Sequence, residues 1–425
     1  IFNTENFGSW WRKIKSKFMN TFRKTRIVYM GTPEFAVAPL KALLDAKYNV
    51  VGVVTVADKP SGRGLKVNES AVKKFAVENN IPVLQPVKLK DPEFLKQLAD
   101  FKADLFVVVA FRMLPEEVWA MPKLGTFNLH AALLPQYRGA APINWAVIHG
   151  EKMSGVTTFM IDKDIDTGGI MLRQECRISE TDTAGDLHDK LMPIGADLVV
   201  QTVEGIIEKN IETRVQRSFI QGSEVLKPAP KLTRELCHID WNDSTRSIYN
   251  LIRGLSPYPA AFTELVPAAG GAPVQLKIYA GAKVEGDEFR SMLVRCGVGD
   301  GFSSGPSNGL SSGPSNGLSS GISSGTSSGT SQGTFHGDQN GVDDNFAVKA
   351  EEGHSGSNIK PGQILSDGKS VFAITTADGA ISLTDLQLAG KKRMEVKPFL
   401  AGFRNPSDWV TTVGTSKEEI DKTRK

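Results

Sequence analysis

The stretch RIVYMGTPEFAVAPLKALLDAKYNVVGVVTV, residues 26–56, places two apolar runs on either side of a segment with helical spacing. It begins with the short apolar run RIVYMG and closes on a Val-rich run at 49–56. Between these runs, Phe35, Leu40 and Leu43 recur at helical spacing. A strand, a helix and a second strand in this order predict one βαβ unit, with its Val-rich strand covered on both faces.

The same alternation continues along the chain. A helix opened by Asp-Pro is expected at 91–101, the apolar run DLFVVVA at 104–110 predicts a strand, and TFNLH at 126–130 predicts the next one. Parallel strands need crossover helices of this kind. We therefore predict a Rossmann-like, doubly wound and mainly parallel α/β sheet. A long helix is expected from about Thr183 to Lys209, interrupted by Pro193.

The composition of the chain and the secondary structure that it predicts change after residue 210. Residues 26–210 are predicted to form the first domain, and the polar stretch 211–233 is predicted to be a linker. Residues 234–415 carry short strand-like runs with Gly, Asp and Asn turns, which predict an OB-like β-barrel. Residues 299–358 are dense in Ser and Gly, so we expect a flexible insertion there, with a binding tail as the alternative.

Composition excludes several classes. The net charge is +3, but residues 1–26 hold +6, so the rest of the chain gives no overall nucleic-acid signal. The basic leader at 1–25 is interpreted as disordered or processed, with a transit peptide as the alternative. The three cysteines are scattered, which predicts neither a disulfide framework nor a metal site. No apolar run of about 18 residues predicts a membrane span.

Polar side chains mark the end of the strand at 126–130. Asn128 and His130 stand two residues apart, so they face the same side of the strand at its carboxyl end, where open α/β sheets bind ligands. Asp166, in DKDIDTGG at 162–169, is a candidate to orient the imidazole. The alternative is two satisfied polar residues that cap a loop.

An amide donor, an imidazole and a carboxylate suit transfer of an acyl group onto an amine. Because no Ser or Cys nucleophile motif accompanies them, a direct transfer is favoured over a covalent intermediate. A zinc site that uses His130 and Asp166 is a weaker alternative, since neither H-E-x-x-H nor paired cysteines occur. No metal is predicted.

Six motifs together resemble the folate-dependent formyltransferase family, and within it the branch that formylates methionyl-tRNA. The resemblance runs from about Arg26 to Phe403, outside the Ser/Gly-rich insertion. The motifs are RIVYMGTPEFA, DKPSGRGLK, FNLHAALLPQYRGAAPINW, GVTTFMIDKDIDTGG, KLTRELCHIDW and LQLAGKKRM.

The resemblance implies a reaction for translation initiation. The donor would be 10-formyltetrahydrofolate, and the acceptor would be the α-amino group of methionine on initiator tRNA. Asn128 would hold the formyl oxygen, His130 would handle protons, and Asp166 would fix His130. The protein would be a cytoplasmic bacterial monomer, or would lie in a mitochondrial or plastid matrix if the leader is a transit peptide.

The resemblance also implies two binding sets. The folate contacts would be Phe111, Arg112, Met113, Leu114, Ala132, Leu133, Leu134 and Pro135. The tRNA contacts would be Lys59, Arg63, Lys66, Lys231, Lys391, Lys392 and Arg393, and Lys227 and Arg234 would supply further phosphate contacts. Two positions depart from the family pattern, because Ala132 stands where Ser is usual and Arg112 where a small residue is usual.

Three alternatives remain open. A formyltransferase with a small-molecule amine acceptor would keep the chemistry, and a formyltetrahydrofolate hydrolase would use water as the acceptor. A non-catalytic RNA-binding protein belongs to a different class. The intact Asn128, His130 and Asp166 speak against the last.

Overall fold

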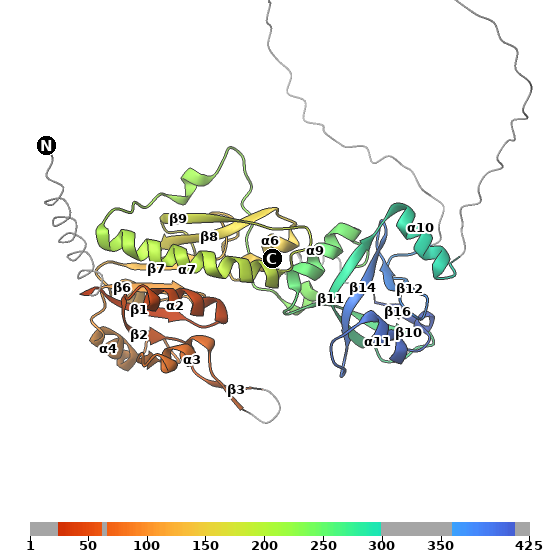
Figure 1. Cartoon of the computed structure of the whole chain (residues 1–425), viewed down its shortest axis with the longest axis horizontal. Coiled ribbons are helices and arrows are strands. Elements are labelled where there is room, and N and C mark those ends of the chain that lie inside the picture. Colours follow the sequence, from red (N-terminus) through yellow and green to blue (C-terminus); the bar gives the residue numbers. More distant parts are fainter. Residues whose placement is uncertain (1–23, 62–65, 299–358, 413–425) are drawn as a thin grey trace, which may run out of the picture.

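The computed structural model describes residues 24–61, 66–298 and 359–412. A mixed sheet with helices on both faces lies beside a smaller antiparallel barrel (Figure 1). The predicted Ser/Gly insertion at 299–358 lies outside the described residues, as do residues 1–23 of the predicted leader.

The N-terminal sheet has seven strands in the order β5-β2-β1-β6-β7-β8-β9. The first five in this order pair in parallel, and β8 and β9 are antiparallel. The prediction of a mainly parallel, doubly wound sheet is therefore confirmed. The strands are β1 (Arg26–Gly31), β2 (Asn49–Val54), β5 (Val83–Leu84), β6 (Leu105–Val109), β7 (Thr126–His130), β8 (Met153–Met160) and β9 (Ile170–Arg177).

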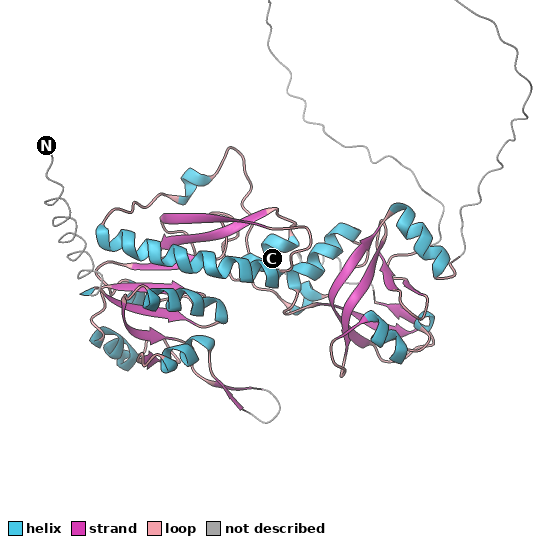
Figure 2. Ribbon diagram, in the orientation of Figure 1, coloured by secondary structure: helices cyan, strands magenta, loops and turns pink. Residues whose placement is uncertain are grey.

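Two hydrophobic cores cover the two faces of this sheet. One core joins Phe127 and Leu129 to Leu187 and Leu191 of the long helix, and the other joins β1 and β6 to α4 and α5. Figure 2 shows helices on either side of the sheet. The helices are η1 (Glu34–Ala36), α2 (Val37–Asp45), α3 (Ala71–Glu78), α4 (Pro92–Asp100), α5 (Glu116–Trp119), α6 (Pro142–Ile148) and α7 (Ala184–Glu208).

Helix α7 runs unbroken through Pro193, so the predicted interruption is wrong. A capping box starts the helix, because the Thr183 hydroxyl accepts from the Asp186 N–H at 3.1 Å and the Asp186 carboxylate accepts from the Thr183 N–H at 2.8 Å. A proline inside a helix costs about 3 kcal/mol or more. Burial of Leu187, Leu191 and the following apolar turns against the sheet offsets that cost.

The C-terminal sheet is antiparallel, with the order β12-β13-β14-β11-β10-β16 and β15 paired to β14. Its two edges meet, because the Thr411 hydroxyl of β16 donates to the Gly362 carbonyl next to β12 at 2.7 Å. The sheet is thus nearly closed, and the OB-like barrel is confirmed. Its strands are β10 (Ala261–Pro267), β11 (Val274–Val284), β12 (Ile364–Ser366), β13 (Phe372–Thr375), β14 (Ala380–Leu388), β15 (Met394–Glu395) and β16 (Trp409–Thr411).

Helix α9 (Thr245–Leu255) connects the two parts. Its buried Arg253 donates to the Asp182 carbonyl at 2.9 Å, and its Gly254 carbonyl accepts from the Asn144 side chain of α6 at 2.8 Å. These bonds fix the barrel against the N-terminal sheet. The remaining helices of this half are α8 (Arg234–Cys237), α10 (Gly286–Arg295), α11 (Val396–Gly402) and η3 (Pro406–Asp408).

A two-stranded hairpin, β3 (Lys59–Ser61) and β4 (Lys66–Asn68), projects from the N-terminal sheet (Figure 1). Residues 62–65, which connect the two strands in the sequence and include the predicted Arg63, lie outside the described residues. Across the described ranges, no helix is long and apolar enough to cross a bilayer.

Candidate active site

Strand β7 brings Asn128 and His130 to the carboxyl edge of the sheet. Phe127 and Leu129 are buried against α7, so the alternate positions face the other way, as the sequence predicts. Asn128 is half-buried, and its amide has no hydrogen-bond partner among the residues that the structure describes. This amide is therefore available to a ligand.

His130 is held by a hydrogen bond at Nε2 and faces a carboxylate with Nδ1. Its side chain is 5% exposed, and Nε2 lies 2.8 Å from the Tyr137 carbonyl oxygen. Because a carbonyl only accepts, Nε2 carries the proton in the neutral ring. Nδ1 is then the nitrogen without a proton in the neutral ring, and it lies 3.9 Å from the Asp166 carboxylate.

Asp166 sits on a strained turn that several bonds hold in place. Its φ is +54°, and its carboxylate accepts from the Gly139 N–H at 3.0 Å. Its carbonyl accepts from the Gln216 side chain at 2.7 Å, and the same amide bonds the Gly168 carbonyl at 2.9 Å. The structure therefore brings His130 and Asp166 together, as the sequence predicts.

Gln216 is a positioning residue that the sequence did not reveal. It is 3% exposed, and its Oε1 accepts from the Arg138 guanidinium at 2.6 Å and 3.0 Å. It thereby joins the loop after β7 to the Asp166 turn. Gln216 is one of two glutamines in the polar stretch predicted to be a linker, and no pattern in the sequence distinguishes it from Gln221.

Thr157 of β8 holds the loop at 132–135 through two hydrogen bonds. The Thr157 hydroxyl donates to the Ala132 carbonyl at 2.7 Å and accepts from the Leu134 N–H at 3.1 Å. Ala132 and Leu134 are fully buried, and the Leu134–Pro135 peptide is cis. Because Ala132 and Leu134 are buried as whole residues, the half-buried Leu133 between them is the exposed part of this stretch.

Arg112 ties together two loops at the carboxyl edge. Its guanidinium donates to the Val87 carbonyl at 2.9 Å and to the Pro86 carbonyl, both after β5. Burial lowers the pKa of this guanidinium, and its Nε is buried without a partner within the described chain. Arg112 thus secures the segment 111–114, in which Leu114 is buried and Met113 is 66% exposed.

We expect Arg112→Ala to raise the KM for formyl-folate about tenfold or more with little change in kcat. Hydrogen bonds from a charged donor contribute about 1.5–3 kcal/mol, and their removal frees a loop implied to bind folate. Steady-state kinetics with varied donor will measure this. Lys90→Ala is the control, and an unchanged donor KM in Arg112→Ala would contradict the clamp.

The residues implied to bind tRNA come from separate segments of the chain. Lys231, Lys391 and Lys392 are exposed. Arg393 is engaged within the barrel, because Nε lies 2.8 Å from Asp385 and the guanidinium stacks 4.2 Å from the Tyr279 ring. Lys59 and Lys66 lie on the β3–β4 hairpin.

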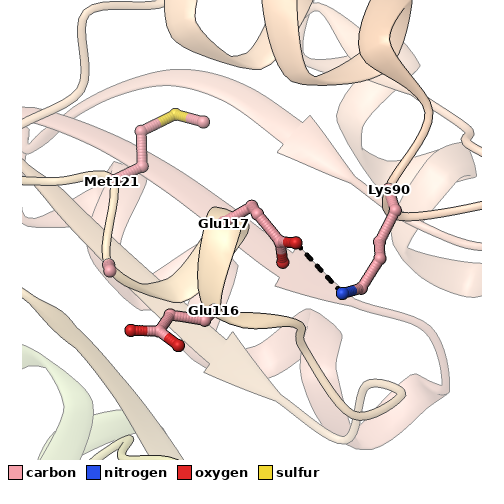
Figure 3. A pocket seen from close by; sticks show the side chains of 5 residues that line it. Lys90, Glu116, Glu117 and Met121 are labelled. Atoms are coloured by element: carbon pink, nitrogen blue, oxygen red, sulfur yellow. Dashed lines mark hydrogen bonds and ion pairs between the residues drawn. The ribbon is translucent and has the colours of Figure 1, made fainter.

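A shallow hollow lies beside α5, lined by Lys90, Glu116, Glu117, Ala120 and Met121 (Figure 3). Lys90 pairs with Glu117 at 3.0 Å across it. No predicted site residue lines this hollow. Among the described residues, no group of three or more His, Cys, Asp or Glu side chains is placed to hold a metal ion.

Comparison with known proteins agrees with the geometry. The formyl transferase family matches residues 24–203, and the formyl transferase C-terminal domain family matches residues 231–297 and 344–404. A methionyl-tRNA formyltransferase of Parabacteroides distasonis is 43% identical over 390 residues, which cover 92% of this chain and 98% of the relative. A methionyl-tRNA formyltransferase of Flavobacterium psychrophilum is 55% identical over 255 residues, 60% of this chain and 79% of the relative.

Among solved structures, HypX from Aquifex aeolicus in complex with tetrahydrofolic acid has a TM-score of 0.49 and 14% identity, over 88% of this chain and 46% of that one. This likeness carries no argument about function. The family is identified instead by the sequence comparisons, which match both halves of the chain. This chain belongs to the formyl transferase family and, within it, to the methionyl-tRNA formyltransferases.

Proposed function

We propose that Asn128, His130 and Asp166 carry the reaction of this family, which moves a formyl group from 10-formyltetrahydrofolate to the α-amino group of methionine on initiator tRNA. The new bond joins the amine nitrogen to the formyl carbon, and the bond from that carbon to folate N10 breaks. One proton leaves the amine and one reaches N10. No covalent enzyme intermediate is required.

Each side chain has a distinct role in this proposal. The Asn128 amide donates to the formyl oxygen as negative charge develops there. His130 exchanges the proton at Nδ1, and Asp166 stabilises the imidazolium. The gap of 3.9 Å is longer than a hydrogen bond, but catalytic contacts are often loose before substrates bind.

The observation that carries the proposal is the state of His130. Its Nε2 is committed to a main-chain carbonyl and its Nδ1 faces a carboxylate, while the Asn128 amide two residues earlier has no partner within the described chain. A purely structural histidine would need neither the facing carboxylate nor the unpaired amide.

Folate is held, in this proposal, by the two loops at the carboxyl edge. The segment 111–114 would supply backbone groups, and the loop at 132–135, braced by Thr157, would lie against the donor. Because Ala132 and Leu134 are fully buried, the half-buried Leu133 would make the contact of this loop with the donor. We propose that the chain acts as a monomer, since a single chain supplies every residue named here.

We further propose that the barrel and the β3–β4 hairpin bind the tRNA. Lys231, Lys391 and Lys392 are exposed cations suited to phosphates, and Arg63, which lies in the sequence between β3 and β4, is a further cation of the predicted set. The Parabacteroides and Flavobacterium relatives are bacterial proteins, which supports a cytoplasmic location. A mitochondrial or plastid matrix remains the alternative if residues 1–25 are a transit peptide.

The tRNA acceptor is tested by the double variant Lys391→Ala/Lys392→Ala and by Arg63→Ala. Removing one cation that neutralises a phosphate should reduce the slope of log affinity against log salt by about one unit. We therefore expect weaker, less salt-dependent tRNA binding with an unchanged KM for formyl-folate.

Lys96→Ala, on an exposed face of α4, is the matched control. Unchanged tRNA affinity and salt slope in both variants would contradict the assigned tRNA surface.

A further inference from the structure

The polar segment at 224–230 packs along the loop that follows His130. The Tyr137 N–H donates to the Lys227 carbonyl at 2.7 Å, and the Ala229 N–H donates to the Arg138 carbonyl at 2.8 Å. Gly139 and Ala229 form a parallel β-bridge. A Cβ on Gly139 would lie only 2.4 Å from the Ala229 carbonyl oxygen, so the two backbones touch.

Side chains reinforce this backbone pairing. The Gln136 side chain donates to Glu224 at 2.7 Å and accepts from the Lys227 N–H at 2.8 Å. The Trp145 indole donates to the Pro230 carbonyl at 2.8 Å. The segment predicted to be a linker is therefore bonded to the loop around the site.

A single carboxylate oxygen, on Glu151, bonds both the loop that follows His130 and the segment at 224–230. Glu151 Oε1 accepts from the Tyr137 hydroxyl at 2.6 Å and from the Lys227 ammonium at 2.6 Å. The hydroxyl also lies 3.2 Å from His149 Nδ1. Burial alone would raise the pKa of the Glu151 carboxyl, but the bonds from Lys227 and Tyr137 lower it overall, so this carboxyl stays ionised.

Tyr137 links this cluster to His130. Its ring is buried, and its φ of +60° is unusual for a residue with a bulky side chain. The left-handed conformation costs about 1–2 kcal/mol, so the surroundings must impose it. That conformation aims the Tyr137 carbonyl at His130 Nε2, 2.8 Å away.

We propose that Tyr137, Glu151 and Lys227 are positioning residues that hold His130 in the tautomer with the proton on Nε2. Lys227 and the Tyr137 hydroxyl meet on Glu151, the anchored ring fixes the Tyr137 backbone, and that carbonyl holds the imidazole. The interdomain segment is thereby part of the catalytic site. This inference rests on the proposed role of His130.

Kinetics of Tyr137→Phe, Glu151→Ala and Glu151→Gln provide the first test. Phenylalanine keeps the ring but removes the hydroxyl, so we expect kcat to fall about tenfold with the KM of both substrates changed less than twofold. Glu151→Ala should reduce kcat as much. Glu151→Gln should recover part of the activity, because its Oε1 still accepts from Tyr137.

Glu117→Gln is the matched control, since Glu117 also pairs with a lysine in the N-terminal half, at 3.0 Å from Lys90. It should leave kcat unchanged. Equal reductions of activity in the control and the test variants, or effects that appear only in KM, would overturn the positioning role.

Imidazole NMR provides the test that does not need activity. Long-range ¹H–¹⁵N spectra distinguish the two tautomers, and His130→Gln identifies the His130 signals among the six histidines. We expect a protonated Nε2 in the unmodified protein and a mixture of tautomers in Tyr137→Phe.

The two claims can fail separately. An unmodified protein that lacks formyl transfer but shows the tautomer shift in Tyr137→Phe would refute the proposed function and keep the positioning inference. An active protein whose Tyr137→Phe variant keeps both its kcat and the His130 tautomer would refute the inference alone.

Discussion

His130→Ala is expected to lower kcat by about a hundred- to ten-thousandfold, the range that a positioned general acid–base group supplies. The alanine removes Nδ1, the nitrogen that faces Asp166 at 3.9 Å and is free to exchange a proton. Substrate binding should change much less, because the folate loops are braced by Thr157 and Arg112 instead. Steady-state kinetics with both substrates varied will separate kcat from KM.

The matched control for this variant is His188→Ala, a half-exposed histidine of α7 that pairs with Asp189. Circular dichroism should show that both variants keep the fold. Near-normal turnover in His130→Ala would remove the histidine from the mechanism and leave the site without an acid–base group.

Asn128→Ala is expected to lower kcat by about a hundred- to a thousandfold, as the removal of one oxyanion donor does. Within the described chain this amide bonds nothing, so its removal should not disturb the folded protein. Asn128→Asp should be at least as damaging, because a carboxylate would repel the developing negative charge. Single-turnover rates with saturating donor and acceptor will measure the chemical step.

Asn210→Ala is the control for Asn128→Ala, because Asn210 is exposed and its side chain bonds Glu208. It should leave the single-turnover rate unchanged. An Asn128→Ala variant that is impaired only in substrate affinity would show that Asn128 binds the donor without stabilising the transition state.

Local patterns account for the parts of the fold that were predictable. The apolar strand at 105–109 is buried throughout and the Val-rich strand at 49–54 over its last three residues, and the period of two in TFNLH placed Asn128 and His130 correctly. Asp91 caps α4 by accepting from the Glu93 N–H at 2.9 Å, as the Asp-Pro signal predicts. Each of these signals lies within a few residues.

Other features depend on tertiary contacts that no local pattern encodes. Proline disfavours the interior of a helix, yet α7 continues through Pro193 because the helix packs on the sheet. The bond from Gln216 to Asp166 spans 50 residues. The carbonyl that bonds His130 Nε2 belongs to Tyr137. No sequence pattern predicts the left-handed φ of Tyr137.

The role of Arg112 illustrates the same limit. The resemblance marked it only as an unusual residue in a segment implied to bind folate. Its bond to Val87 crosses 25 residues and joins loops that follow two strands, which are separated in the sheet by β2 and β1. Only the folded sheet places these loops side by side.

The proposed reaction is direct transfer of the formyl group to charged initiator tRNA. The most direct measurement follows label from 10-formyltetrahydrofolate, labelled in the formyl group, with methionyl-initiator tRNA, methionyl-elongator tRNA or no acceptor. We predict label in formyl-methionine from the initiator tRNA, much less from the elongator tRNA, and negligible formate without acceptor. Release of label as formate at the same rate with and without tRNA would contradict the account and identify water as the acceptor.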